Sequence, residues 1–289
     1  MLYTETIERI IEVGFATPYL EDETCSRPFN IALVTLSGGG KSAILLEKFG
    51  ELKGVETLGD VTYDGLTKIY LDKIAKKEIL TPVFEEFNKI IRRKASTAQN
   101  TLGIINMMCE EGVPSIDLPY FHRSWNPPVK CNVIIGMTPS LLNTHLIDWW
   151  GSGLAQRFLF VTWNYTKEQE RRILGYIQKQ MHLTIERFSK IQIDTKIELS
   201  ERLAHKLEPY SIQICKDMTD YVESLYLSRN WKFDRKIERE LPFRTQMRLQ
   251  KFLKALALVN GRKKVTPFEL KEFKELFKFM NLRFNELED

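Results

Sequence analysis

A short apolar run leads into three consecutive glycines in the stretch LVTLSGGGKSAILLEKF, residues 33–49. Lys41 and Ser42 follow directly, and the apolar residues after them have helical spacing. The stretch is close to G-x-x-x-x-G-K-[ST], the pattern of a loop that binds nucleotide phosphates. It departs from that pattern at Thr35, which stands where the first glycine belongs. Two interpretations stay open from this stretch alone, a nucleotide site and a structural glycine turn.

The residues from Ser37 to Ala43 satisfy the physical requirements of phosphate binding. Successive backbone amides of a glycine turn form an anion-binding concavity, and the N-terminus of the following helix adds the positive end of its dipole. Glycines allow close approach and positive φ. Lys41 supplies a point charge for the phosphate oxygens, and Ser42 supplies a hydroxyl for Mg²⁺. The cofactor-binding residues are therefore predicted to be Ser37, Gly38, Gly39, Gly40, Lys41, Ser42 and Ala43.

Hydrophobic patterning predicts strands that alternate with helices in the first half of the chain. The predicted strands are 30–36, 78–86, 130–138 and 156–163. The predicted helices are 4–14, 41–53, two segments within 87–111, then 166–188, 200–228, 245–259 and 266–280. Interleaved strands and helices are typical of a mainly parallel sheet covered on both faces. We therefore expect an α/β domain at 1–165 and a mostly helical domain at 166–289.

The start of the last predicted helix is well marked. Thr266 suits the N-cap position, Pro267 the first helical position and Glu269 the closing position of a capping box.

A pair of carboxylates follows the second predicted strand. Glu85 and Glu86 end an apolar run in TPVFEEFNKI, residues 81–90. A phosphate loop needs an acidic partner on a neighbouring strand, normally Asp for the metal or its water and then Glu to orient the attacking water. Here Glu85 takes the metal position with one extra methylene. A helix N-terminus that favours carboxylates is the alternative explanation for the pair.

Composition excludes few classes of function. The chain has 289 residues, a formal net charge of +4 and 43% hydrophobic residues, which is ordinary for a globular protein. The four cysteines show no C-x-x-C pair, which favours free thiols in a reducing compartment. No apolar run is long enough to span a membrane. The N-terminus carries acidic residues within its apolar stretch, so we expect an intracellular, cytoplasmic protein without a membrane partner.

The order of several motifs resembles a known family. The stretches are VETLGDVTYDGLTKIY (55–70), VFEEFNKI (83–90), VIIGMTP (133–139), LAQRFLF (154–160) and RTQMRLQKFLKALALVNGRKKVTPFELKEF (244–273). With the glycine loop, they resemble the ATPase domain of minichromosome maintenance (MCM) replicative helicases, a branch of the AAA+ superfamily. The resemblance implies a P-loop AAA+ three-layer α/β domain followed by a helical lid.

The same resemblance assigns roles to single residues. Glu86 takes the water-orienting position and Glu85, with Ser42, the metal position, which implies ATP and Mg²⁺ as cofactors. Thr138 stands where the family has the sensor asparagine. Arg157 falls on the arginine finger, expected to reach the site of a neighbouring subunit, and Arg244 on the second sensor arginine.

Simpler explanations stay open for three of these residues. Arg157 is also explained as a strand-edge arginine that pairs with an acid, and Arg244 as a surface residue of an amphipathic helix. Thr138 is also explained as a cap at the end of the strand before Pro139.

The segment before the sensor strand is the candidate for contact with DNA. The family carries a pore-facing β-hairpin there, and residues 113–132 occupy that place. Phe121, His122 and Arg123 combine aromatic and basic side chains, which suits single strands through base stacking and phosphate contact. Prolines 119, 127 and 128 make a regular hairpin doubtful, so an irregular loop is the alternative. The basic run at 89–95 is a second possible patch or simply a solvated helix face.

The function predicted from these motifs is ATP hydrolysis in a ring-shaped homo-oligomer, expected to be a hexamer, that remodels, unwinds or translocates on DNA. The family's N-terminal DNA-binding region is missing from the sequence, so we expect a minimal form that serves the replication of a mobile element. Two alternatives stay open: a nucleotide-gated adaptor that recruits a partner with little hydrolysis, and a non-enzymatic DNA-binding protein.

Overall fold

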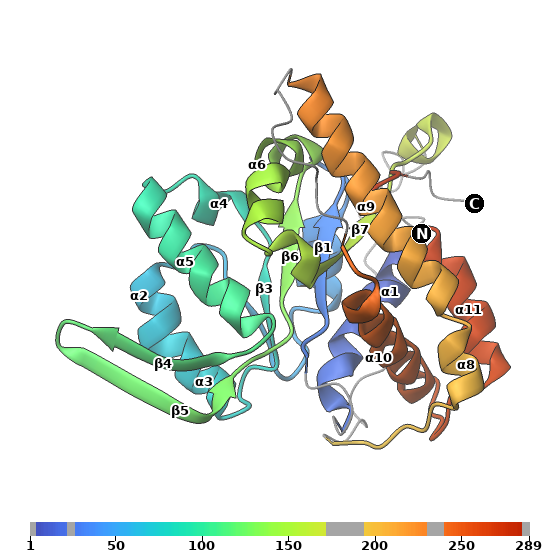
Figure 1. Cartoon of the computed structure of the whole chain (residues 1–289), viewed down its shortest axis with the longest axis horizontal. Helices are drawn as coiled ribbons and strands as arrows, with labels where there is room; N and C mark the ends of the chain where they lie inside the picture. The colour runs from blue at the N-terminus through green and yellow to red at the C-terminus, as the bar shows by residue number, and fades with distance from the viewer. Residues whose placement is uncertain (1–3, 22–26, 172–193, 230–239, 285–289) are drawn as a thin grey trace.

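A parallel five-stranded sheet forms the centre of the protein (Figure 1). The computed structural model describes residues 4–21, 27–171, 194–229 and 240–284. The strand order is β2-β3-β6-β1-β7, and each neighbouring pair is parallel. The strands are β1 Asn30–Val34, β2 Val55–Thr57, β3 Thr81–Phe84, β6 Ile134–Met137 and β7 Phe158–Thr162. The predicted α/β class with a mainly parallel sheet is confirmed.

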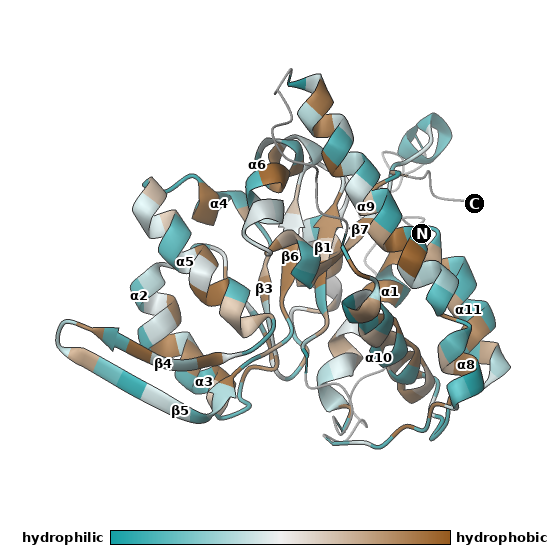
Figure 2. Ribbon diagram, in the orientation of Figure 1, coloured by the Kyte–Doolittle hydropathy of each residue, from teal (hydrophilic) through white to brown (hydrophobic). Residues whose placement is uncertain are grey.

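The sheet is buried on both faces, and its side chains alternate between two cores. Ile31 and Leu33 of β1 belong to one hydrophobic cluster, whereas Ala32 and Val34 belong to the other. This alternation follows from the two-residue period of a strand. It explains why the central strands are continuous apolar runs, which Figure 2 shows as hydrophobic ribbons on β1, β6 and β7.

Helices cover the two cores. The α-helices are α1 Glu5–Ala16, α2 Tyr63–Gly65, α3 Leu71–Ala75, α4 Asn88–Ile91, α5 Ala95–Met108, α6 Pro139–Gly151, α8 Glu201–His205, α9 Glu208–Ser228, α10 Phe243–Val259 and α11 Pro267–Phe277. Short 3-10 helices are η1 Thr17–Tyr19 and η4 Ala155–Arg157, and π-helices are η2 Ala43–Lys48 and η3 Leu66–Tyr70. No helix of the described ranges is long and apolar enough to cross a membrane.

Two helix predictions need correction. The helix predicted at 41–53 is shorter and is a π-helix, Ala43–Lys48. The helix predicted at 200–228 is two helices, because α9 begins at Glu208 with Pro209 in its first turn, where a missing N–H costs no hydrogen bond. Most of the helix predicted at 166–188 lies outside the described residues.

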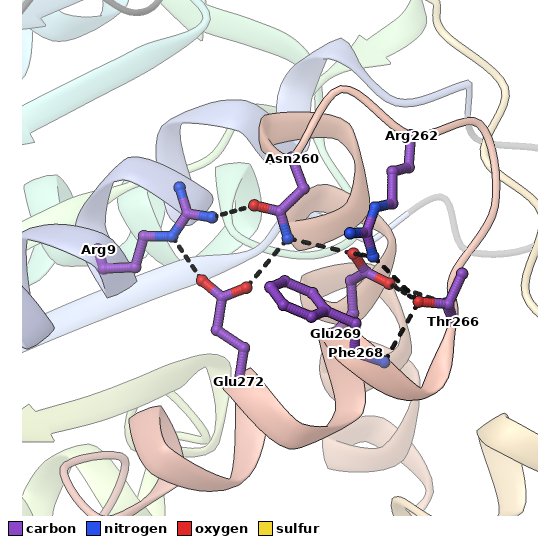
Figure 3. Close-up of polar contacts among 7 residues, drawn as sticks. All are labelled: Arg9, Asn260, Arg262, Thr266, Phe268, Glu269 and Glu272. Carbon is purple, nitrogen blue, oxygen red and sulfur yellow. Dashed lines mark hydrogen bonds and ion pairs between the residues drawn. The ribbon is translucent and has the colours of Figure 1, made fainter.

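The N-terminal helix packs with the C-terminal helices. Helix α1 contacts α10 and α11, and its core residues share one cluster with theirs. Arg9 of α1 donates from Nε to Glu272 at 2.8 Å and from Nη2 to Asn260 at 2.5 Å (Figure 3). The predicted capping box is confirmed, since the Thr266 amide donates to Glu269 Oε2 at 2.9 Å. The first helix is therefore bonded to the region that the sequence assigned to a separate helical domain.

A β-hairpin projects from the body of the protein, as Figure 1 shows. Strands β4 Val113–Leu118 and β5 Phe121–Val129 are antiparallel and turn through Pro119 and Tyr120. The doubt raised by the prolines is therefore removed. The reason is that the pairing shifts between Val113 and Ser115, and Pro127 and Pro128 lie opposite this irregular part. Irregular pairing tolerates residues that cannot donate to the ladder.

Candidate functional site

The glycine loop connects the end of β1 to the π-helix η2. Gly38 and Gly40 have φ angles of 80° and 83°, a backbone conformation that side chains rarely adopt. The first of them is exposed and the second half-buried. The glycines are thus required by the backbone, as expected of a turn that presents amides to a ligand.

A cavity of about 380 Å³ lies over this loop. Its lining combines the loop with the ends of β3 and β6: Ser37, Gly38, Gly39, Gly40, Lys41, Ser42, Ala43, Glu85, Glu86, Asn88, Gly136, Met137, Thr138 and Leu141. All the residues predicted for phosphate, metal and water orientation therefore meet in one place, together with Thr138. The volume falls in the range of small-molecule sites, roughly 300–1,000 Å³.

Lys41 lies close to the loop backbone. Its Nζ donates to the carbonyl of Thr35 at 2.9 Å and to that of Leu36 at 3.1 Å. Burial lowers the pKa of Lys41 to about 8, because the loop removes water from the ammonium group. At neutral pH this lysine is charged. Its ammonium group has a third N–H, which an anionic ligand could accept.

The two carboxylates enter the cavity from the end of β3. Glu85 is half-buried, and Gly136 of β6 allows the close approach, since a Cβ there would lie 2.5 Å from the Glu85 carbonyl. Glu86 is more exposed and forms an ion pair with Lys89 at 2.7 Å. This geometry makes Gly136 a supporting residue that the sequence analysis missed. Its only sequence signal is a glycine inside a predicted buried strand.

Three further lining residues were also missed. Asn88, Met137 and Leu141 line the cavity, but none of them carries a recognisable chemical pattern in the sequence. Asn88 follows the acidic pair by two positions, and this proximity is the one signal that identifies it.

Thr138 is the N-cap of helix α6. Its hydroxyl accepts from the amide of Leu141 at 3.4 Å, a long hydrogen bond, and Pro139 opens the helix. The capping explanation is therefore observed, with the correction that Thr138 caps a helix rather than a strand end. Because Thr138 also lines the cavity, its oxygen has room to contact a ligand.

Arg157 and Arg244 lie together, away from the cavity. Arg157 Nε contacts Glu110 Oε2 at 2.6 Å, and Arg244 Nη2 contacts Glu110 Oε1 at 2.6 Å. Arg27 adds a third ion pair to Oε1 at 3.0 Å. Glu110 is only 4% exposed. We call these four residues the Glu110 cluster. Arg157 therefore pairs with an acid, and its role towards a neighbouring subunit stays a prediction.

The Glu110 cluster lies where the parallel strands begin. We call this end of the sheet its amino edge, and the end where the strands run into the glycine loop its carboxyl edge. Phe158 follows Arg157 and pairs with Asn30 at the start of β1, whereas the glycine loop follows the end of β1. The Asn30 side chain also donates to the Arg157 carbonyl at 3.0 Å. A five-residue strand is roughly 15 Å long. The arginines and the cavity are thus on opposite edges of one sheet.

The predicted DNA-contact residues lie on the hairpin, but their side chains differ in how firmly they are paired with other residues. Arg123 forms ion pairs through Nε and Nη2 with Asp72, at 3.0 and 2.5 Å. Lys68 lies 6.0 Å from the centre of the Phe121 ring. His122 is exposed, with Asp117 at 3.7 Å from its Nδ1. Arg123 is therefore held against α3, whereas His122 faces solvent.

The cavity fits a magnesium-bound polyphosphate on charge. Its lining carries one cation, Lys41, and two carboxylates, Glu85 and Glu86. A polyphosphate alone would meet repulsion from the two acids, which a divalent cation between them would offset. Mg²⁺ binds through one or two carboxylates, substrate phosphates and water, and a serine hydroxyl joins this set in phosphate loops. Among the described residues, no group of three or more His, Cys, Asp or Glu forms a protein-only metal site.

No protein-family model matches the chain, and the search of the curated proteins also finds no match.

Proposed function

We propose that the protein is an ATPase of the AAA+ type, similar to the MCM branch, that acts on DNA as an oligomeric ring. The observation that carries the proposal is the cavity where the glycine loop and Lys41 face Glu85 and Glu86. These groups come from two segments far apart in the sequence, residues 37–43 and 85–86. Their meeting at one sheet edge is what phosphoryl transfer requires, since that chemistry depends on positioning and charge neutralisation.

Each cavity residue has a distinct task in the proposed reaction. The loop amides and Lys41 bind the phosphates, and Ser42 and Glu85 hold the magnesium ion and its waters. Glu86 orients the attacking water and accepts its proton. For this task Glu86 must leave Lys89, an exposed partner whose ion pair is weak because water screens it.

The position of the arginines supports assembly. Charge on the transferred phosphoryl group needs an additional cation, and a trans arginine contributes roughly 10³–10⁵ in rate. Arg157 and Arg244 lie at the other edge of the sheet from the cavity of their own chain. In a ring, the amino edge of one copy would face the cavity of the next.

Nucleotide binding and turnover of purified wild-type protein test this proposal. Lys41→Ala is expected to weaken ATP binding by roughly 10- to 100-fold, because it removes a charge-assisted contact to phosphate. Lys68→Ala is the matched control, since Lys68 is an exposed lysine outside the cavity. Equal ATP affinity in the wild type and Lys41→Ala would overturn the proposal.

A nucleotide-gated adaptor is the second candidate. It is favoured by the Glu86–Lys89 ion pair and by the Thr138 hydroxyl, which already caps α6, because both groups are occupied outside catalysis. Turnover separates the two functions. Tight binding with hydrolysis no faster than in Glu86→Gln, at concentrations where the protein assembles, would favour the adaptor.

A further inference from the structure

Two aromatic side chains contact the glycine loop from the side opposite the cavity. Trp163 and Tyr165 follow the end of β7, which is the outermost strand of the sheet and the neighbour of β1. Neither residue lines the cavity. Trp163 is completely buried, and Tyr165 is half-buried.

Both side chains donate to one carbonyl. Trp163 Nε1 and Tyr165 Oη each lie 3.2 Å from the oxygen of Gly39. A third hydrogen bond joins the same elements in the other direction, from the hydroxyl of Thr35 to the carbonyl of Trp163 at 2.8 Å. We call Thr35, Trp163 and Tyr165 the loop brace.

The brace fixes the orientation of one peptide group. In a trans peptide the carbonyl of one residue and the amide of the next point in opposite directions. The Gly39 carbonyl is directed to β7, so the Gly40 amide is directed away from β7. The other cavity-lining residues come from the ends of β3 and β6, which lie on the other side of β1. The Gly40 amide is thereby turned to the cavity side.

The packing leaves the loop little freedom. A Cβ on Gly40 would lie 3.1 Å from the Tyr165 hydroxyl, and a Cβ on Gly39 would lie 2.6 Å from the Thr35 methyl. Thr35 is the residue that departs from the phosphate-loop pattern. Its hydroxyl gives that departure a physical role, since glycine offers no group to bond Trp163.

We propose that the loop brace consists of positioning residues that hold the Gly39–Gly40 peptide ready for a polyphosphate before the ligand arrives. This inference rests on the proposed nucleotide site and deepens it. Preorganised donors bind more tightly because less ordering is required on binding. Burial raises the pKa of Tyr165, so its hydroxyl stays a donor at neutral and mildly alkaline pH.

Tyr165→Phe is the decisive variant, because it removes one hydroxyl and keeps the ring. The affinities for ATP and for ADP with magnesium are expected to fall equally, by about three- to tenfold, as for a lost hydrogen bond. Turnover at saturating ATP is expected to stay within twofold of the wild type, since the phosphate-binding amide and not the reacting water is affected. This separation of affinity from turnover is something a general loss of stability would not produce.

Tyr19→Phe is the matched control. The Tyr19 hydroxyl also donates to a backbone carbonyl, that of Lys53 at 3.1 Å, but outside the cavity lining. Its nucleotide affinities are expected to equal those of the wild type. Thr35→Val provides a second variant of nearly unchanged shape, with the same direction of effect expected.

The outcomes separate this inference from the proposed function. Wild-type protein that binds no nucleotide overturns both. Wild-type binding with unchanged affinities in both Tyr165→Phe and Thr35→Val overturns the brace alone and leaves the nucleotide site standing.

Discussion

The two edges of the central sheet hold charge in opposite ways. At the carboxyl edge, the cavity presents Lys41 with Glu85 and Glu86, and all three side chains are at least partly accessible. At the amino edge, the Glu110 cluster buries one carboxylate beneath three guanidinium groups. The first edge leaves its charged side chains accessible, whereas the second pairs three guanidinium groups with a single buried carboxylate and so carries an excess of positive charge.

If the proposed chemistry holds, this difference implies that Arg157 and Arg244 do not act on the cavity of their own chain. Arg157 is joined to the backbone at the start of β7, so it cannot cross the length of the sheet to its own cavity. Under the proposed function, an arginine at the transferred phosphate would come from another copy of the chain. The Glu110 cluster keeps Arg157 and Arg244 side by side, and a neighbouring site would therefore meet them as a pair.

The largest expected effect tests whether the two edges cooperate between copies. Lys41→Ala and Arg157→Ala should each lower ATP hydrolysis by roughly 10³-fold or more, but for different reasons. Lys41→Ala loses nucleotide binding, whereas Arg157→Ala keeps it. Mixing the two variants should restore part of the activity, because some interfaces then combine an intact cavity with an intact Arg157.

The same mixture provides its own controls. Each variant alone at the total concentration of the mixture should stay inactive, and a mixture of Lys41→Ala with the double variant should not recover. Activity of Arg157→Ala equal to the wild type would show that the amino edge plays no part in hydrolysis.

The next effect tests how much the Glu110 cluster at the amino edge contributes to stability. Glu110→Gln leaves three arginines without their common carboxylate and should lower the free energy of unfolding by about 3–5 kcal/mol. Asp217→Asn is the control, since its partner Arg283 is largely exposed, and a loss of at most about 1 kcal/mol is expected. Urea unfolding of both variants measures the difference. Equal stability losses would contradict the description of Glu110 as the buried centre of the cluster.

At the carboxyl edge, ATP affinity should depend on pH. The pKa of Lys41 is lowered to about 8, and a bound phosphate favours the charged lysine. ATP affinity should therefore be nearly constant below about pH 7, be about halved at pH 8 and fall roughly tenfold between pH 7.5 and pH 9. Isothermal titration calorimetry across this range measures it.

Lys41→Arg supplies the comparison for this pH dependence. A guanidinium group stays charged throughout the range. The variant should bind with an affinity that does not change between pH 7.5 and pH 9, even where its absolute affinity is lower. A parallel decline in both proteins would assign the titration to another group.

The sequence predicted the cavity better than the amino edge, and the reason is physical. A candidate phosphate-binding loop depends on local backbone geometry, so Gly38, Gly40 and Lys41 predict it within one short segment. The acidic pair could be placed because carboxyl ends of parallel strands meet at one edge. Gly136 escaped prediction, since its role depends on how closely β6 approaches Glu85.

The Glu110 cluster depends on long-range contacts that no spacing rule describes. Glu110, Arg157 and Arg244 come from a helix end, a strand start and a C-terminal helix. Each looks ordinary within its own segment. The brace is similar: Thr35 appeared only as a departure from a pattern until Trp163 was found beside it. Partners brought together by the fold leave no mark on a single sequence.

The smallest expected effect concerns the hairpin, which begins three residues after Glu110 and so belongs to the amino edge. Arg123 is already paired with Asp72, and only part of its charge is offered to a nucleic acid. Arg123→Gln should weaken binding to single-stranded DNA less than about fivefold and reduce the salt slope by at most about 0.7, the share of one phosphate contact. Arg92→Gln, in the basic run at 89–95, is the matched exposed control. A larger loss from Arg92→Gln would move the DNA-facing surface from the hairpin to α4. In the proposed function, the amino edge would then contribute Arg157 and Arg244 but no contact with DNA.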